Sequence, residues 1–159
     1  MKILGIETSC DETSASIVEN TTSYETVKIL SNVVTSSLAL HSKTGGIVPE
    51  VAAREQVKYI IPVIDKALHS VESINAIAVT VGPGLIGSLL VGVETAKTLA
   101  YVWKKPIIPV NHLIGHIYAN FIGEISNDSI PNFPSLALIV SGGHTDLVLM
   151  KNHGKIKWL

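Results

Sequence analysis

Cysteine and arginine are almost absent from this chain of 159 residues, which contains one of each, Cys10 and Arg54. A single cysteine cannot form an intramolecular disulfide, and this scarcity is typical of proteins in a reducing cytoplasm. Twelve basic and thirteen acidic residues give a formal net charge of −1. A protein that holds RNA unaided usually has a basic surface with several arginines. The composition alone therefore does not indicate RNA binding.

Charged residues are also missing from residues 74–93, a stretch long enough to cross a bilayer. This stretch contains a Gly-Pro-Gly turn at residues 82–84 and further glycines. A buried strand, a turn and a buried helix explain it better than a membrane span. At the N-terminus, only four apolar residues (3–6) separate Lys2 from Glu7, too few for a signal peptide. We therefore expect a cytoplasmic protein without membrane contact.

The apolar residues are arranged in short runs of strand length and in longer runs with helical spacing. Spacings of three and four in the first predicted helix occur at Val57, Ile60, Ile61, Ile64 and Leu68. Pro62 should bend this helix or divide it. The predicted order is β-β-β-α-β-α-β-α, an α/β protein. The strands are expected at 2–8, 14–18, 25–36, 74–81 and 106–110, and the helices at 51–70, 85–103 and 112–122.

After a polar loop the pattern restarts, with strands predicted at 135–140 and 145–150 and a third from Lys155 onward. This is a second copy of the opening hairpin, so we place a first lobe at residues 1–133 and the start of a second lobe at 134–159. Two lobes that each open with a hairpin and a polar tip are typical of the actin-like (ASKHA) fold. In that fold the two tips face each other across a nucleotide-binding cleft, and backbone N–H groups of such turns can hold phosphate oxygens.

His112 and His116 are four residues apart on a predicted helix. Side chains at this spacing lie on one face, so both imidazoles could bind one metal ion. Peptidases of the HExxH type also need a glutamate base after the first histidine, and that position is Leu113. The alternative is a pair of partly buried histidines satisfied by hydrogen bonds. A metal would need another protein ligand, and the sequence offers no obvious one.

Three turns could bind anions, but each also has a simpler structural explanation. In the first tip, Glu7, Asp11 or Glu12 could handle a metal ion or a proton, or the tip could be a solvated turn. The glycines of residues 82–84 could present N–H groups to an anion or could permit close packing of helix on sheet. The second tip, residues 141–144, could bind phosphate or carboxylate, or be a plain Gly-Gly hairpin turn.

Five of these segments occur in series, and together they resemble the TsaD/YgjD family, once described as O-sialoglycoprotein endopeptidases (Gcp). The matching segments are residues 5–13, 45–50, 82–85, 110–116 and 140–145. The resemblance covers essentially the whole chain and implies that it is the N-terminal part of a tRNA N6-adenosine threonylcarbamoyltransferase. Such enzymes transfer a threonylcarbamoyl group from threonylcarbamoyl-AMP to an adenosine next to the anticodon of tRNAs that read ANN codons. The missing base at Leu113 argues against the peptidase description.

The resemblance also implies site residues and partners. A divalent metal, Fe²⁺ or Zn²⁺, would be held by His112 and His116, with an aspartate outside this chain as the third ligand. Contacts to threonylcarbamoyl-AMP would come from Ile139, Val140, Ser141, Gly142 and Gly143. Glu12 and His144 are our candidate catalytic residues. TsaB-like and TsaE-like proteins are the implied partners.

Two other functions remain possible at this stage. A non-catalytic, TsaB-like partner protein would share the fold, but such chains lack the His112/His116 motif. A sugar or acetate kinase would also share it, but such kinases typically have aspartate where this chain has Glu7. We further expect the isolated chain to be inactive and to self-associate through its C-terminal hairpin, whose strands are apolar on both faces.

Overall fold

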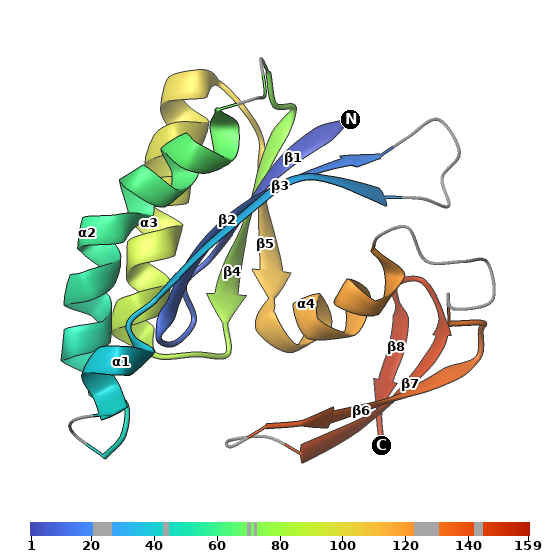
Figure 1. The fold of residues 1–159 in the computed structure, drawn as a ribbon. Helices are drawn as coiled ribbons and strands as arrows, with labels where there is room; N and C mark the ends of the chain where they lie inside the picture. Colours follow the sequence, from blue (N-terminus) through green and yellow to red (C-terminus); the bar gives the residue numbers. More distant parts are fainter. Residues whose placement is uncertain (21–26, 43–44, 70, 72, 123–130, 142–144) are drawn as a thin grey trace.

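The computed structural model describes residues 1–20, 27–42, 45–69, 71, 73–122, 131–141 and 145–159. These residues form two sheets with helices between and beside them (Figure 1). The strands of the first sheet are β1 (Lys2–Glu7), β2 (Glu12–Asn20), β3 (Val27–Ser36), β4 (Ala76–Gly82) and β5 (Ile107–Asn111). The second sheet contains β6 (Ser135–Val140), β7 (Thr145–Asn152) and β8 (Lys155–Trp158). The helices are α1 (Leu38–His41), α2 (Pro49–Leu68), α3 (Ile86–Trp103), α4 (His112–Tyr118) and the 3₁₀ turn η2 (Ala119–Phe121).

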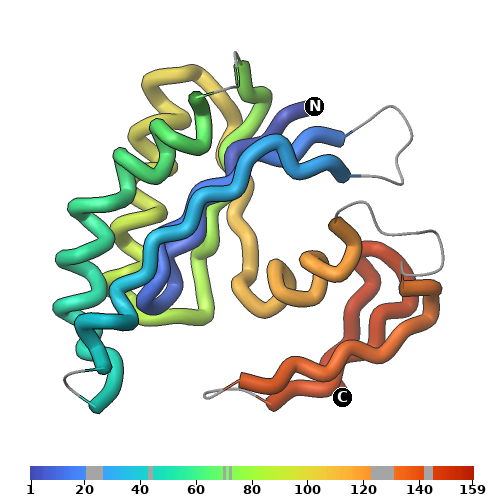
Figure 2. Tube along the Cα trace, viewed as in Figure 1, coloured from blue at the N-terminus to red at the C-terminus, as the bar shows by residue number. Residues whose placement is uncertain are grey.

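The first sheet has the strand order β3-β2-β1-β4-β5, with β1 at its centre. β1 pairs antiparallel with β2 and parallel with β4, so Leu4 lies opposite both Ile17 and Ile77. These apolar side chains belong to the core that α2 and α3 cover, and Figure 1 shows the two helices side by side along this face. α4 lies beyond the other face, between the two sheets (Figure 2). The predicted α/β order is thus confirmed, with the short helix α1 as the one addition among the described residues.

α2 continues through Pro62 and is not divided there. The helix buries Ile60 and Ile64, as the spacing indicates, because these residues face the sheet. Val57 and Ile61 are 63% and 58% exposed. The apolar stripe of the sequence is therefore wider than the face that the sheet covers.

The second sheet is antiparallel in the order β6-β7-β8, which confirms the predicted hairpin and the third strand. Its inner face, with Val148 and Met150 buried, packs on Ile117 of α4. On its outer face Leu136, Leu138 and Val140 are 64%, 66% and 70% exposed. Both faces are thus apolar, but only one is covered by the described residues. The lobe boundary at residues 133 and 134 stays a prediction.

None of the helices that the structure describes is long and apolar enough to span a membrane.

We expect the outer face of the second sheet to drive self-association of the 159-residue chain. Full burial of a large apolar side chain contributes about 1.5–3 kcal/mol, and these residues retain most of that potential. Sedimentation velocity at micromolar concentration should show a dimer or larger species. Leu138→Lys, which places a charge in the centre of this face, should weaken the association at least ~10-fold.

Val34→Lys is the matched control, because Val34 is 51% exposed on β3, in the first sheet. It should leave the association unchanged. A monomeric wild-type chain, with residues 135–159 protected as in the structure, would contradict this expectation.

Candidate metal centre

α4 begins directly after β5 because Asn111 caps it. The Asn111 side-chain oxygen accepts hydrogen bonds from the backbone N–H groups of Leu113 and Ile114, at 3.0 and 3.2 Å. Such a cap satisfies N–H groups that have no partner inside the helix. His112 is therefore the first residue of α4, at the edge of the first sheet where β5 ends.

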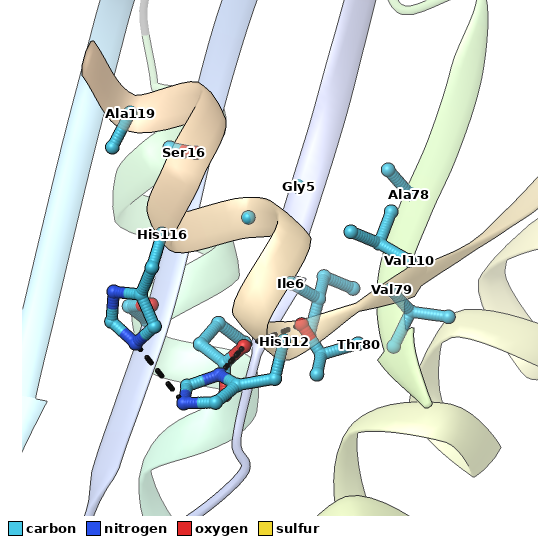
Figure 3. Close-up of a pocket in the computed structure, with 13 residues that line it drawn as sticks. Gly5, Ile6, Ser16, Ala78, Val79, Thr80, Val110, His112, His116 and Ala119 are labelled. Atoms are coloured by element: carbon cyan, nitrogen blue, oxygen red, sulfur yellow. Dashed lines mark hydrogen bonds and ion pairs between the residues drawn. The ribbon is translucent and has the colours of Figure 1, made fainter. Parts of the chain in front are cut away.

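The rings of His112 and His116 lie on one face of α4 and approach edge to face, with centroids 4.4 Å apart and planes at 80° (Figure 3). Their Nε2 atoms are 3.1 Å apart. Neither ring lies in a closed apolar core. The prediction that the two ring nitrogens converge is confirmed.

Glu7, the last residue of β1, contacts Nδ1, the second nitrogen of the His112 ring. Its Oε2 atom lies 3.2 Å from His112 Nδ1, across 105 residues of sequence. The same oxygen accepts a hydrogen bond from the Thr80 hydroxyl on β4, and Oε1 accepts one from the backbone N–H of Ser9. The Ser9 hydroxyl is also 3.2 Å from His112 Nδ1. The carboxylate therefore fixes the orientation of the ring.

These contacts decide the charge of Glu7. Burial by itself would raise the pKa of its carboxyl group, but the hydrogen bonds from Ser9, Thr80 and His112 outweigh burial and leave that pKa below its ordinary value. Glu7 is thus a carboxylate at neutral pH and accepts the Nδ1 proton of His112. Nε2 of His112 then has a free lone pair, which accepts a hydrogen bond from His116 in this arrangement.

The separation of the two Nε2 atoms is compatible with a shared metal ion. Two imidazole nitrogens bound to one ion at about 2.0–2.1 Å, with an angle of roughly 90–110° between the bonds, lie about 2.8–3.4 Å apart. The Nε2 separation of 3.1 Å falls in this range. A metal-binding histidine usually donates its second N–H to a carboxylate or carbonyl, as His112 does to Glu7. Among the described residues, no third histidine, cysteine or carboxylate completes a cluster.

The end of β6 adjoins the histidine pair. His116 and Asn120 on one side, and Ile139, Val140 and Ser141 on the other, line a pocket of about 240 Å³. The structure thus brings part of the predicted substrate-binding strand next to the predicted metal ligands. The other members of these predictions, Gly142, Gly143 and His144, lie outside the described residues.

A second pocket, of about 410 Å³, lies between α4 and the first sheet (Figure 3). Its floor is made of small side chains from β1, β2 and β4, including Gly5, Ser16 and Ala78. His112 and His116 line it as well, and His116 borders both pockets.

Glu12, the candidate catalytic residue of the first tip, begins β2 and is exposed. Within the described part of the chain, no hydrogen bond or ion pair links its carboxylate to either histidine. The acidic residue of this tip that contacts His112 is instead Glu7. The sequence singled out Glu7 as one of three acidic candidates, but a contact across 105 residues leaves no local signal.

Gly84 and Gly92 have a packing role, whereas Gly82 has open space around it and a φ of 148°. A Cβ atom on Gly84 would lie 2.6 Å from the carbonyl oxygen of Ser9, and one on Gly92 would lie 2.4 Å from the Thr8 hydroxyl. The backbone N–H of Leu85, before α3, donates to the same Ser9 carbonyl at 2.7 Å. Close packing of the first tip against the segment that leads into α3, and against α3 itself, therefore accounts for Gly84 and Gly92.

Comparison with known proteins gives the family. The model of the family described as TsaD, tRNA N6-adenosine threonylcarbamoyltransferase, matches residues 28–159. The chain belongs to the TsaD family.

Three curated relatives carry the same description as the family. The relative from Thermomicrobium roseum is 56% identical, over 97% of this chain and 42% of its own length. The relative from Dehalococcoides mccartyi is 53% identical, over 100% of this chain and 47% of its own. The relative from Staphylococcus saprophyticus is 54% identical, over 95% of this chain and 42% of its own length. This TsaD-family chain therefore spans less than half the length of these relatives.

Solved structures confirm the actin-like fold. A Pseudomonas aeruginosa protein described as similar to peptidase YeaZ aligns with a TM-score of 0.56 at 14% identity, over 99% of this chain and 63% of its own. The Aquifex aeolicus PPX-GPPA enzyme aligns with a TM-score of 0.56 at 13% identity, over 100% of this chain and 52% of its own length. At such identities the likeness extends to the fold alone.

We expect Glu7→Gln to weaken metal binding by the TsaD-family protein about 10–100-fold, the usual effect of losing a carboxylate partner of a metal-bound histidine. Glutamine can still accept from Ser9 but has no charge to hold the Nδ1 proton of His112. The measurement is an isothermal calorimetric titration of the complete protein with Zn²⁺.

Glu19→Gln, on the same hairpin but at the far end of β2, is the matched control and should bind as the wild type does. His116→Ala should remove the high-affinity site. Wild-type affinity in His116→Ala would show that the pair is not a metal site. Wild-type affinity in Glu7→Gln would show that the carboxylate does not support metal binding.

Proposed function

We propose that the complete protein carrying this chain is a tRNA N6-adenosine threonylcarbamoyltransferase. The family match supports the activity. The observation that carries the proposal is the convergence of the His112 and His116 Nε2 atoms beside the end of β6. This arrangement supports a metal site next to the strand expected to hold the substrate.

The proposed reaction is an acyl transfer from threonylcarbamoyl-AMP. The N6 amine of the tRNA adenosine attacks the carbamoyl carbon, and a C–N bond forms. The bond between that carbon and the phosphate oxygen breaks, and AMP leaves with the electron pair. One proton of the amine passes to a base. Nothing is oxidised or reduced, so the reaction needs no redox cofactor.

A divalent metal ion, Fe²⁺ or Zn²⁺, would be held by Nε2 of His112 and His116 and by a third ligand from the rest of the protein. When bound, the ion would supply Lewis-acid polarisation of a substrate oxygen. Glu7 would keep the His112 ring in the tautomer that binds metal, because its carboxylate accepts the Nδ1 proton.

The substrate would lie along the end of β6. Ile139, Val140 and Ser141 line the pocket beside His116 and offer backbone groups and a hydroxyl. Gly142 and Gly143 would extend this contact. Glu12 and His144 remain our candidates for proton transfer, and the exposed carboxylate of Glu12 is free to move toward a substrate.

The proposed partners follow from the family and from the chain's charge. tRNA is the acceptor substrate named in the family description. With one arginine and a net charge of −1, this chain is poorly equipped to hold RNA alone. TsaB-like and TsaE-like proteins, and the rest of the complete protein, would supply the missing contacts. The location we propose is the cytoplasm, where tRNA is modified.

The second candidate, a TsaB-like non-catalytic partner, shares the fold with this chain. That function does not account for the paired histidines or for the contact between the Glu7 carboxylate and His112. The match over residues 28–159 is also to the transferase family. We therefore favour the enzyme.

The direct test is transfer of the threonylcarbamoyl group to unmodified tRNA by the complete protein, with threonylcarbamoyl-AMP and partner proteins supplied. Mass spectrometry of the nucleosides should show the modified adenosine. His112→Ala should lower kcat at least ~100-fold, since it removes a group that holds the reacting centre in place. His69→Ala, a histidine at the C-terminal end of α2, is the control and should retain most activity. A wild-type protein that makes no product in this assay would overturn the proposal.

The isolated 159-residue chain should give no product in the same assay. Its described residues contribute only two of the expected metal ligands. An actin-like active site is also formed between two lobes, and this chain spans 42–47% of its relatives' length. Modified adenosine above a blank without the chain would show that the active site lies entirely within these residues.

A further inference from the structure

The carboxamide of Gln56 connects α2 to the loop between β1 and β2. Its Nε2 atom is 2.9 Å from the carbonyl oxygen of Cys10, 3.1 Å from that of Glu12 and 3.3 Å from that of Thr8. An amide nitrogen has two hydrogens, so three acceptors share them. One side chain therefore holds three alternate carbonyl groups of the loop.

The two carbonyl groups in between are held from other elements. The Ser9 carbonyl accepts from the backbone N–H of Leu85, at 2.7 Å. The Asp11 carbonyl accepts from the backbone N–H and the hydroxyl of Ser37, both at 2.9 Å. Every carbonyl from residue 8 to residue 12 thus has a donor. Gln56 donates to three of the five and shares that of Cys10 with the Ser88 hydroxyl.

Gln56 is 1% exposed, and its Oε1 atom has no hydrogen-bond partner among the described residues. A buried acceptor without a partner destabilises the fold. An apolar side chain of the same length would fill the space without this penalty. The contacts that this side chain makes as a polar group are therefore those to the loop.

The loop that Gln56 holds carries groups of the candidate site. The Ser9 hydroxyl is 3.2 Å from His112 Nδ1, and the Ser9 N–H donates to Glu7. Glu12, the candidate proton-transfer residue, is the last residue whose carbonyl Gln56 binds. A shift of this loop would move Ser9 and Glu12 together.

We propose that Gln56 is a positioning residue for the transfer reaction: by binding the carbonyl groups of Thr8, Cys10 and Glu12, it sets the position of the loop that carries Ser9 and Glu12. Gln56 itself touches neither histidine and is not a catalytic residue. The inference rests on the proposed transferase function for its kinetic consequence. Its structural part, that Gln56 fixes the loop, stands independently.

The test compares two variants of the complete protein. Gln56→Met keeps the length of the side chain and removes the donor, and Gln56→Glu keeps its shape and turns the donor into an acceptor that repels the carbonyls. In the transfer assay kcat should fall about 10–100-fold in Gln56→Met, as expected for misplaced reacting groups. The fall should be larger in Gln56→Glu. KM for tRNA should stay within about twofold in both, because no tRNA contact is removed.

Val63→Ala is the matched control for simple loss of stability. Val63 is buried on the same helix, and it packs in the core rather than on the loop. It should lower the melting temperature at least as much as Gln56→Met and leave kcat near the wild-type value below that temperature. Equal loss of kcat in the two variants would reduce Gln56 to a structural residue and overturn the proposal. Wild-type kcat in Gln56→Met would also overturn it.

Hydrogen exchange separates this inference from the proposed function. The backbone N–H groups of Leu85 and Ser37 are bonded to the loop carbonyls of Ser9 and Asp11. They should exchange faster in Gln56→Met than in the wild type or in Val63→Ala. If the wild-type protein makes no product, the transferase function fails, and faster exchange still supports loop fixation by Gln56. Unchanged exchange at both amides would reject that fixation whatever the activity.

Discussion

The parallel pairing of β1, β4 and β5 is the constraint on which the candidate site depends. Neighbouring parallel strands end at the same edge of a sheet, where α/β proteins place their ligands. Ile6 pairs with Val79 and Thr80 with Val110, so the next residues along the strands meet at this edge. Glu7 thereby reaches both the Thr80 hydroxyl and the His112 ring. The orientation of a histidine on α4 is thus set by the central strand of the sheet.

The first loop adds a second layer to this arrangement. Its backbone is held on one side by α2 and on another by the start of α3, where Gly84 and Gly92 allow contact with Ser9 and Thr8. Ser88 both accepts and donates a hydrogen bond at this contact. Its carbonyl accepts from the Thr8 hydroxyl, and its hydroxyl donates to the Cys10 carbonyl. Gly84, a candidate for anion binding from the sequence, instead permits close packing. The backbone carbonyl groups of the loop are held in place by α2, α3 and Ser37.

The sequence predicted the parts of this molecule that depend on local pattern. Apolar runs located the strands β1 to β8 and the helices α2, α3 and α4 to within a few residues, and the spacing of His112 and His116 was sufficient to predict their convergence. Contacts between distant residues could not be predicted, because Glu7 and Gln56 owe their roles to partners 105 and 44–48 positions away. Gln56 in particular resembles any polar residue on an amphipathic helix, and only its burial distinguishes it. The four-residue helix α1 has no periodic signal at all.

α4 has two roles. It carries the histidine pair, and it packs against the second sheet. Beyond His116 the chain continues into an aromatic cluster, in which Phe121 stacks on Phe133 with centroids 5.7 Å apart and His153 meets Phe133 at 4.7 Å. The Tyr118 hydroxyl accepts from the backbone N–H of Gly154 at 2.9 Å, which ties the β7–β8 turn to the same helix. These contacts fix β6 relative to α4, and β6 ends at the pocket beside His116. The distance between the metal ligands and the strand proposed to hold the substrate is therefore set by aromatic packing outside the site. A change in that packing would alter this distance while leaving the Glu7–His112 contact and the β6–β7 hairpin each intact.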